Sequence, residues 1–216
     1  MANGHPGGRH RYGAVLVLVL AIAIFALIAP EGRGVRGLEL MAAGAALVLA
    51  VLTSRAPAVT RRTSGAVVSI GVIAAGIVAL AGHPHPALTL GGTAVLLAAT
   101  GGVILAGLVR LVVERGVILQ AVLGALAVYV LVGLTFGFLV GAIAVGGHSL
   151  YFAQGTDAVQ SQRVYYSFTV LTTTGFGDLT PATRPGRALA VLEMLLGQLY
   201  LVTVIAMLVG NLRRRP

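Results

Sequence analysis

The chain has 216 residues, of which 57% are hydrophobic and only 10% charged, and its mean hydropathy is +0.97. This composition excludes an ordinary water-soluble globule and predicts an integral membrane protein. The absence of cysteine excludes disulfides and thiolate metal sites, and the five histidines show no metal-ligand spacing. All fifteen basic residues are arginines that lie mostly between apolar runs, so the net charge of +9 indicates membrane topology rather than nucleic-acid binding.

Six apolar runs follow one another along the chain, and each is predicted as a membrane-spanning helix. They cover residues 12–29, 37–52, 65–81, 88–109, 117–145 and 188–209, with glycine, proline and arginine at the breaks. The first run follows Arg9 and Arg11, but it is longer than a signal-peptide core and lacks an A-x-A cleavage site. A retained span is therefore expected, and cleavage would remove it without changing the remaining topology.

A more polar stretch, residues 146–187, separates the last two runs. Its apolar middle, residues 163–172, is too short to span and is predicted as a re-entrant helix. The sequence TTTGFGD follows at residues 172–178, with glycines that tolerate positive φ and let carbonyl oxygens turn to one side. Carbonyl oxygens replace the hydration shell of a cation in ion selectivity filters. The expected ion-binding residues are Thr173, which can add its hydroxyl, Thr174, Gly175, Phe176 and Gly177.

At these residues the chain resembles the potassium channel pore family, whose signature is usually written TTVGYGD. The resemblance covers about residues 117–209, with Tyr165 and Tyr166 at the family's paired aromatics and Gly197 at its inner-helix glycine, a candidate gating hinge. It implies an all-α membrane protein of six transmembrane helices, with a pore helix and filter between the fifth and sixth. One chain holds a single filter, so a homotetramer is expected, with permeant K⁺ and no cofactor.

Arginine placement predicts the orientation of a multi-pass protein of the cell membrane with both termini in the cytoplasm. The expected parts are a cytoplasmic N-terminus (1–11), a four-helix domain (12–115), a pore domain (116–211) and a cytoplasmic tail (212–216). Arg33 and Arg36, in the first external loop, are the exceptions to the rule. The other outer arginines are Arg163, Arg184 and Arg187, and the inner ones are Arg9, Arg11, Arg55, Arg61, Arg62, Arg110, Arg115, Arg213, Arg214 and Arg215.

Two departures from the signature bear on selectivity. Phe176 replaces tyrosine and loses a hydroxyl, and Thr174 replaces valine and adds one. A potassium-selective channel is therefore one reading, and a poorly selective monovalent cation channel is the alternative. A potassium uptake transporter subunit is a third reading, although such proteins usually carry four filter-like loops per chain. A non-conducting membrane scaffold is a fourth, and an enzyme is not expected.

Other residues are expected to support the filter or to gate it. Thr172 begins the signature, Asp178 lies at its outer mouth within reach of Tyr165, and Thr169 replaces a glutamate that some members of the family place behind the filter. Glu193, the only acid well inside the last run, is either a packing acid, bonded to a hydroxyl or held protonated, or a gating residue.

Three further features bear on packing and gating. Gln198 faces either the cavity or another helix, and the stripe Gly133, Gly137 and Gly141 is expected to pack against the last span or the first four. The fourth run carries no charge, which predicts little or no voltage dependence. The tail residues Arg213, Arg214 and Arg215 either anchor topology or bind anionic lipid headgroups.

Overall fold

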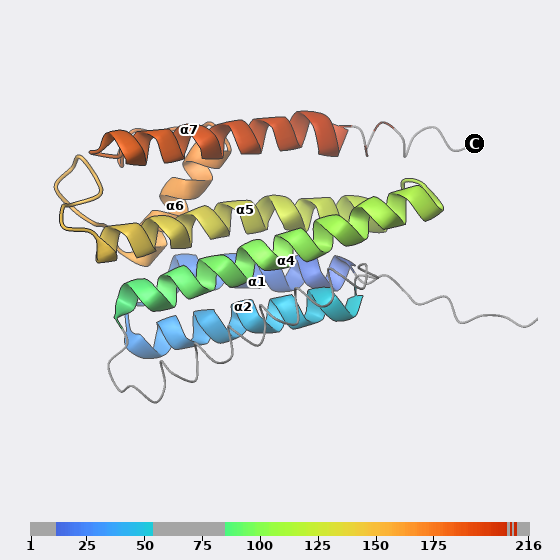
Figure 1. Ribbon diagram of the computed structural model, residues 1–216, viewed down its shortest axis with the longest axis horizontal. Coiled ribbons are helices and arrows are strands. Elements are labelled where there is room, and N and C mark those ends of the chain that lie inside the picture. The colour runs from blue at the N-terminus through green and yellow to red at the C-terminus, as the bar shows by residue number, and fades with distance from the viewer. Residues whose placement is uncertain (1–11, 54–84, 207, 209, 211–216) are drawn as a thin grey trace, which may run out of the picture.

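A computed structural model describes residues 12–53, 85–206, 208 and 210, and the predicted third span and both terminal segments lie outside these residues. The described part of the chain is all-helical (Figure 1). Its elements are α1 (Tyr12–Ile28), α2 (Arg33–Thr53), α4 (Pro86–Arg115), α5 (Leu119–Gly146), α6 (Gln160–Leu171), α7 (Arg184–Leu199) and the π-helical η1 (Tyr200–Ile205).

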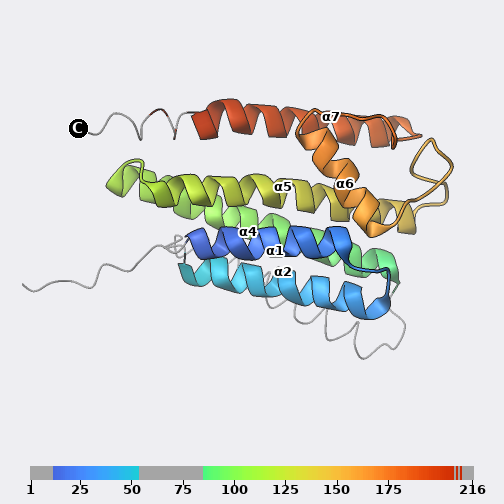
Figure 2. The same ribbon diagram turned by 180° about the vertical axis from the view of Figure 1, so that it is seen from behind.

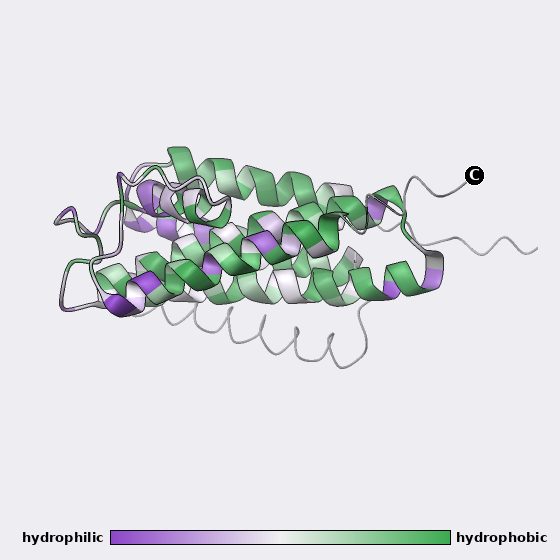
Figure 3. Ribbon diagram, turned by 90° about the horizontal axis from the view of Figure 1, so that it is seen from above, coloured by the Kyte–Doolittle hydropathy of each residue, from purple (hydrophilic) through white to green (hydrophobic). Residues whose placement is uncertain are grey.

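Four stretches of the described chain are long and apolar enough to cross a membrane: α2, α4, α5 and the continuous helix Arg184–Ile205. α1 is equally apolar but has only 17 residues. Green, hydrophobic residues cover most of the helical surface, and purple, hydrophilic residues gather toward the ends (Figure 3). Of the six predicted spans, these four are therefore supported as multi-pass membrane helices.

Helix boundaries differ from the sequence-based ones where local capping decides them. α2 begins at Arg33, so Arg33 and Arg36 lie in its first turn rather than in a loop. α7 begins four residues before the predicted start, because the Thr183 hydroxyl accepts from the backbone N–H of Gly186 at 3.2 Å and proline follows at the first turn. α4 extends to Arg115, where Gly116 adopts a φ of 69° and ends the helix.

Buried hydroxyls of the apolar helices find their partners within the helix. Thr93 and Thr100 of α4 donate to the carbonyl oxygens one turn earlier at 2.9 and 2.7 Å, and Thr135 of α5 does the same at 2.7 Å. Polar groups in a membrane have no water to bond, so this back-bonding lets α4 and α5 stay embedded.

α7 stands apart from the other long helices. α1, α2, α4 and α5 pack side by side, with the most extensive contact between α4 and α5 (Figure 2). α6 crosses obliquely from this bundle to α7 (Figure 1). Only 17% of the most apolar stretch of the α7 helix is buried, so most of its surface is open in the single chain.

The glycine stripe of α5 packs against α6, which corrects the expected partner. Added Cβ atoms would meet α6 at 2.9 to 3.0 Å for the first two glycines and at 2.5 Å for the third. α4 adds only one contact, from Leu90 to the third glycine at 3.3 Å. The three pairs are Gly133 with Phe168, Gly137 with Val164, and Gly141 with Gln160. Spacing showed that a helix could approach closely here, but not that the short helix would be the one to do so.

Candidate functional site

The residues Thr172 to Asp178, here called the TTTGFGD segment, leave the C-terminal end of α6 between α5 and α7. Three backbone hydrogen bonds join them to that helix. Thr172 donates to Phe168 at 3.0 Å, Thr173 to Val170 at 2.9 Å, and Gly175 to Thr169 at 3.1 Å. The helix therefore places the segment at its negative end, which favours cations.

The backbone of the TTTGFGD segment alternates in handedness. Thr173, Gly175 and Gly177 have φ values of 57°, 53° and 81°, whereas Thr174 and Phe176 have negative φ. Where φ alternates in sign, successive carbonyl groups are able to turn to a common side, whereas in a strand they point to opposite sides. Such a row of oxygens suits a dehydrated cation.

Side chains of α6 brace one side of the segment. The ring of Tyr165 stacks on that of Phe176, with centroids 6.2 Å apart and planes 3° from parallel, and desolvation, followed by the nearby Asp178 carboxylate, raises the pKa of Tyr165. Thr174 and Thr172 share a hydrogen bond of 2.8 Å, and the Thr172 hydroxyl lies 2.7 Å from the carbonyl oxygen of Phe168. These contacts join the side chains of Thr172, Thr174 and Phe176 to α6 or to one another.

The chain just after the C-terminal end of the TTTGFGD segment is held by the loop that precedes α6. Ala153 donates to Thr180 at 2.8 Å and Ala182 donates to Tyr151 at 2.9 Å, so these two stretches pair like short strands. Phe152 is 1% exposed and meets the ring of Tyr166 edge-on at 5.1 Å.

The N-terminal end of the TTTGFGD segment meets α7. The Gln198 amide donates to the Thr173 hydroxyl at 2.9 Å, and that hydroxyl donates to the carbonyl oxygen of Thr172 at 2.7 Å. One residue earlier, a Cβ added at Gly197 would lie 2.4 Å from the carbonyl oxygen of Leu171. Gly197 therefore allows the α7 backbone to touch the end of α6, and the π-helical stretch begins three residues later at Tyr200.

A buried polar chain lies behind the TTTGFGD segment. Glu193 of α7 is 1% exposed and is hydrogen-bonded to the Ser167 hydroxyl of α6, which is fully buried. The same Ser167 oxygen lies 2.6 Å from the carbonyl oxygen of Gly133 in α5. Ser167 of α6 therefore links α5 and α7.

The start of α6 is bound by the N-terminal hairpin. Glu31, between α1 and α2, accepts a hydrogen bond of 2.6 Å from the backbone N–H of Gln160 and lies 3.4 Å from Arg36. The buried Arg163 donates to the carbonyl oxygen of Asp157 at 2.9 Å. A carboxylate at a helix N-terminus satisfies a free N–H and complements the helix dipole.

The structure brings the predicted residues together around one segment. Thr169 is buried and supports the segment through its backbone, and Asp178 is exposed at the outer end. The sequence analysis gave no role to Ser167 or Glu31, and it left two positions open for the Gln198 side chain, the cavity or another helix. The position of Gln198 beside Gly197, a glycine that permits close helix contact, could have indicated that its side chain bonds to a neighbouring element. No local pattern could have indicated the role of Glu31, because its partner Gln160 is 129 positions away.

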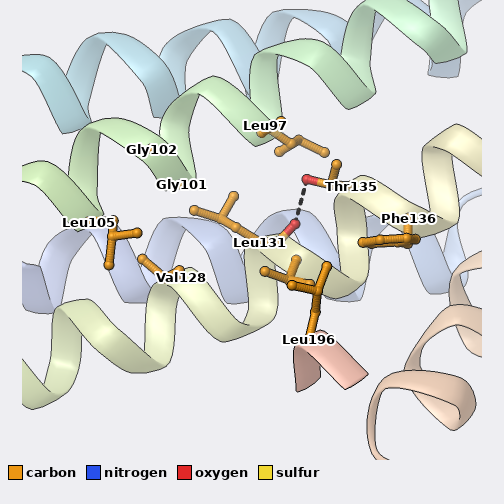
Figure 4. A pocket seen from close by; sticks show the side chains of 11 residues that line it. Leu97, Gly101, Gly102, Leu105, Val128, Leu131, Thr135, Phe136 and Leu196 are labelled. Carbon is orange, nitrogen blue, oxygen red and sulfur yellow. Dashed lines mark hydrogen bonds between the residues drawn. The ribbon is translucent and has the colours of Figure 1, made fainter. Parts of the chain in front are cut away.

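An apolar hollow of about 240 Å³ lies between α4, α5 and α7 (Figure 4). Gly101 and Gly102 leave room on α4, and Phe136 and Leu196 line the other sides. The Thr135 hydroxyl at its edge already bonds to Leu131, as the dashed line shows. This hollow therefore offers no oxygen ligands to an ion, in contrast to the TTTGFGD segment.

Comparison with known proteins places this geometry in a class. Residues 125–214 match a family model described as an ion channel. No curated protein and no solved structure shows a significant match to the chain. The match begins within α5 and includes α6, the TTTGFGD segment and α7. This part of the chain is thus similar to ion channels, which supports a channel rather than an enzyme.

Proposed function

We propose that the protein is a potassium-selective channel of the cell membrane, in which α6 is a pore helix and the TTTGFGD segment is the selectivity filter. The positive φ values at Thr173, Gly175 and Gly177 support this proposal, because they would allow carbonyl oxygens to face a dehydrated cation. Residues 173–177 would bind the ions in a row, and Asp178 would concentrate cations at the outer mouth. K⁺ would pass down its electrochemical gradient, with no other cofactor.

The functional unit would be a homotetramer. One chain supplies a single filter segment, and all seven of its residues are exposed in the single chain. The neighbouring face of α7 also exposes large apolar side chains, including Leu192 at 57% and Leu195 at 53%. Four copies around an axis would surround an ion with carbonyl oxygens and cover part of this face.

Gating would depend on α7 and not on charge in α4. Gly197 and Glu193 both contact the pore helix and are the candidate hinge and gating residues. α4 carries no charge between Pro86 and Val109, so little voltage dependence is expected. With both termini in the cytoplasm, Arg213, Arg214 and Arg215, outside the described residues, would meet anionic lipid headgroups.

A poorly selective monovalent cation channel is the second candidate, and the extra hydroxyl of Thr174 favours it. That hydroxyl bonds to Thr172 rather than standing free, which supports the selective reading. Reversal potentials in bilayers with K⁺ and Na⁺ on opposite sides separate the two, and the same recordings over a voltage series test voltage dependence. A potassium uptake transporter subunit remains a third candidate that passive flux would exclude.

The flux test uses two glycines with the same backbone requirement. Gly175 has a φ of 53° and Gly155, in the loop before α6, has a φ of 74°, and an added Cβ meets nothing within 4 Å at either. Each alanine substitution therefore imposes a similar strain of about 1–2 kcal/mol. In liposomes loaded with K⁺, Gly175→Ala should abolish a flux that Ba²⁺ blocks, and Gly155→Ala should retain it. Equal flux from both variants would refute the filter assignment.

A further inference from the structure

Glu193 is a carboxyl group placed where water does not reach. It is 1% exposed on α7, and no salt bridge to it exists among the described residues. Its bonding partner is the Ser167 hydroxyl, which is itself fully buried. An ionised carboxylate in such a place needs a counter-charge or several donors, and here it has one shared hydroxyl.

The number of available protons indicates whether the Glu193 carboxyl group is protonated or ionised. A serine hydroxyl has one proton and donates one hydrogen bond. The carbonyl oxygen of Gly133 is only an acceptor and lies 2.6 Å from Ser167 Oγ, so that proton belongs to it. An ionised Glu193 would be a second acceptor facing the same oxygen with no proton between them. A protonated Glu193 supplies the missing proton.

We propose that Glu193 is a positioning residue that stays protonated and donates to Ser167, which in turn donates to the Gly133 carbonyl, so that two hydrogen bonds fasten α7 through α6 to α5. This inference rests on the proposed channel function and names how its filter is held. Loss of the proton, as in alkaline solution, leaves two acceptors against one hydroxyl and releases the fastening.

The fastening lies directly behind the filter. Ser167 and Leu171 are four residues apart on α6, and Glu193 and Gly197 are four apart on α7, so the helices meet at two points of one face. Thr169, two residues after Ser167, supplies the carbonyl oxygen that accepts from the N–H of Gly175. A shift of α7 away from α6 therefore moves the base of the filter.

Two tyrosines are the titratable groups near enough to sense a charge on Glu193. Tyr151 belongs to the loop before α6, and Tyr166 is on α6 itself. Burial, with a smaller contribution from Glu193, raises the pKa of Tyr151 to about 12, so its hydroxyl stays neutral at moderately alkaline pH. No arginine of the described residues forms a salt bridge that would hold Glu193 ionised.

The test compares Glu193→Gln, Glu193→Leu and Ser167→Ala with the wild type in K⁺-loaded liposomes, from neutral to alkaline pH. Glutamine keeps a donor for Ser167 but cannot ionise, so it should retain neutral-pH flux and abolish the alkaline decline seen in the wild type. Glu193→Leu and Ser167→Ala should lower flux about tenfold at every pH, equivalent to a link of ~1.4 kcal/mol. Glutamine behaving like leucine, or keeping the wild-type pH profile, would overturn the proposal.

A second measurement does not depend on conduction or on the folding of a variant. Infrared spectra of the wild type in lipid should show the carbonyl band of a protonated carboxyl that shifts in D₂O, and Glu193→Gln should lack it. A wild type that shows this band but conducts nothing would refute the channel while leaving the protonation established. Normal flux without the band would refute the role of Glu193 alone.

Discussion

Thr173 has a positive φ, which is unusual for a β-branched residue. Gly175 and Gly177 are residues at which a positive φ is expected. Thr173 also has a φ of 57°, a conformation that costs a β-branched residue about 1–2 kcal/mol or more. Several hydrogen bonds stabilise that conformation: the Thr173 N–H donates to Val170, and the Thr173 hydroxyl bonds to Thr172 and Gln198. Sequence reasoning predicted a hydroxyl at the inner end and missed the strain, because no local pattern displays it.

In the proposed filter, the Gln198 amide would compete with a cation for the Thr173 hydroxyl oxygen, to which it donates at 2.9 Å. That oxygen already gives its proton to Thr172, so the amide bond occupies one of its two lone pairs. Gln198→Leu removes the competitor and should tighten block by Ba²⁺ applied from the inner side. A hydrogen bond worth ~0.5–1.5 kcal/mol corresponds to a change of roughly two- to twelvefold.

A matched control for Gln198 lies in the outer loop. Gln154 also donates its amide to a threonine hydroxyl, that of Thr180, at 3.2 Å. Gln154→Leu should therefore leave inner block unchanged. Weaker or unchanged Ba²⁺ block in Gln198→Leu would show that the amide does not compete at this oxygen.

At the scale of elements, long apolar helices were the easiest features to predict. α2, α4, α5 and the α7 helix all overlap predicted runs, because roughly twenty apolar residues in a row have few alternatives. α6 was also expected, although its first three residues were missed. Its N-terminal turn is polar and is stabilised by Glu31 and by the Gln162 side chain, which bonds the backbone of Val159 at 3.0 Å. The hydrophobic periodicity of the sequence does not reveal such hydrogen bonds. The spacing of the glycines likewise did not identify α6 as the helix that packs against them.

The closest backbone approach between α5 and α6 is at Gly137. A Cβ there would lie 3.0 Å from the Cα of Val164, so backbone must move to make room. Gly137→Ala should lower the free energy of unfolding by about 1–3 kcal/mol, measured as the thermal midpoint in detergent. Gly102→Ala, in α4 with nothing within 4 Å, should be neutral or slightly stabilising because alanine favours helix. Equal destabilisation by both variants would contradict the packing assigned to the stripe.

At the scale of the whole molecule, the single chain is asymmetric. A packed bundle of α1, α2, α4 and α5 lies on one side, and α7 with the TTTGFGD segment lies open on the other. Composition predicted a membrane protein, and the ion channel match covers the open half. Assembly state cannot be derived from composition, since it depends on surfaces that only a second copy would cover.

The absence of cysteine allows a direct count of subunits. Ser149 is exposed in the loop after α5, so Ser149→Cys accepts one fluorophore per chain with little change in size. Single assemblies in lipid should bleach in up to four steps, as a homotetramer requires. A distribution that ends at one or two steps would contradict the tetramer, and unlabelled wild type gives the background.

The bond between Glu31 and the first N–H of α6 also has a meaning for biosynthesis. Its acceptor is made with the first hairpin, and its donor emerges 129 residues later. During synthesis, the hairpin is therefore in place long before the helix that it caps. α6 is too short to cross the bilayer and settles only onto partners already assembled. The first two helices are thus synthesised well before the helix whose N-terminus Glu31 caps.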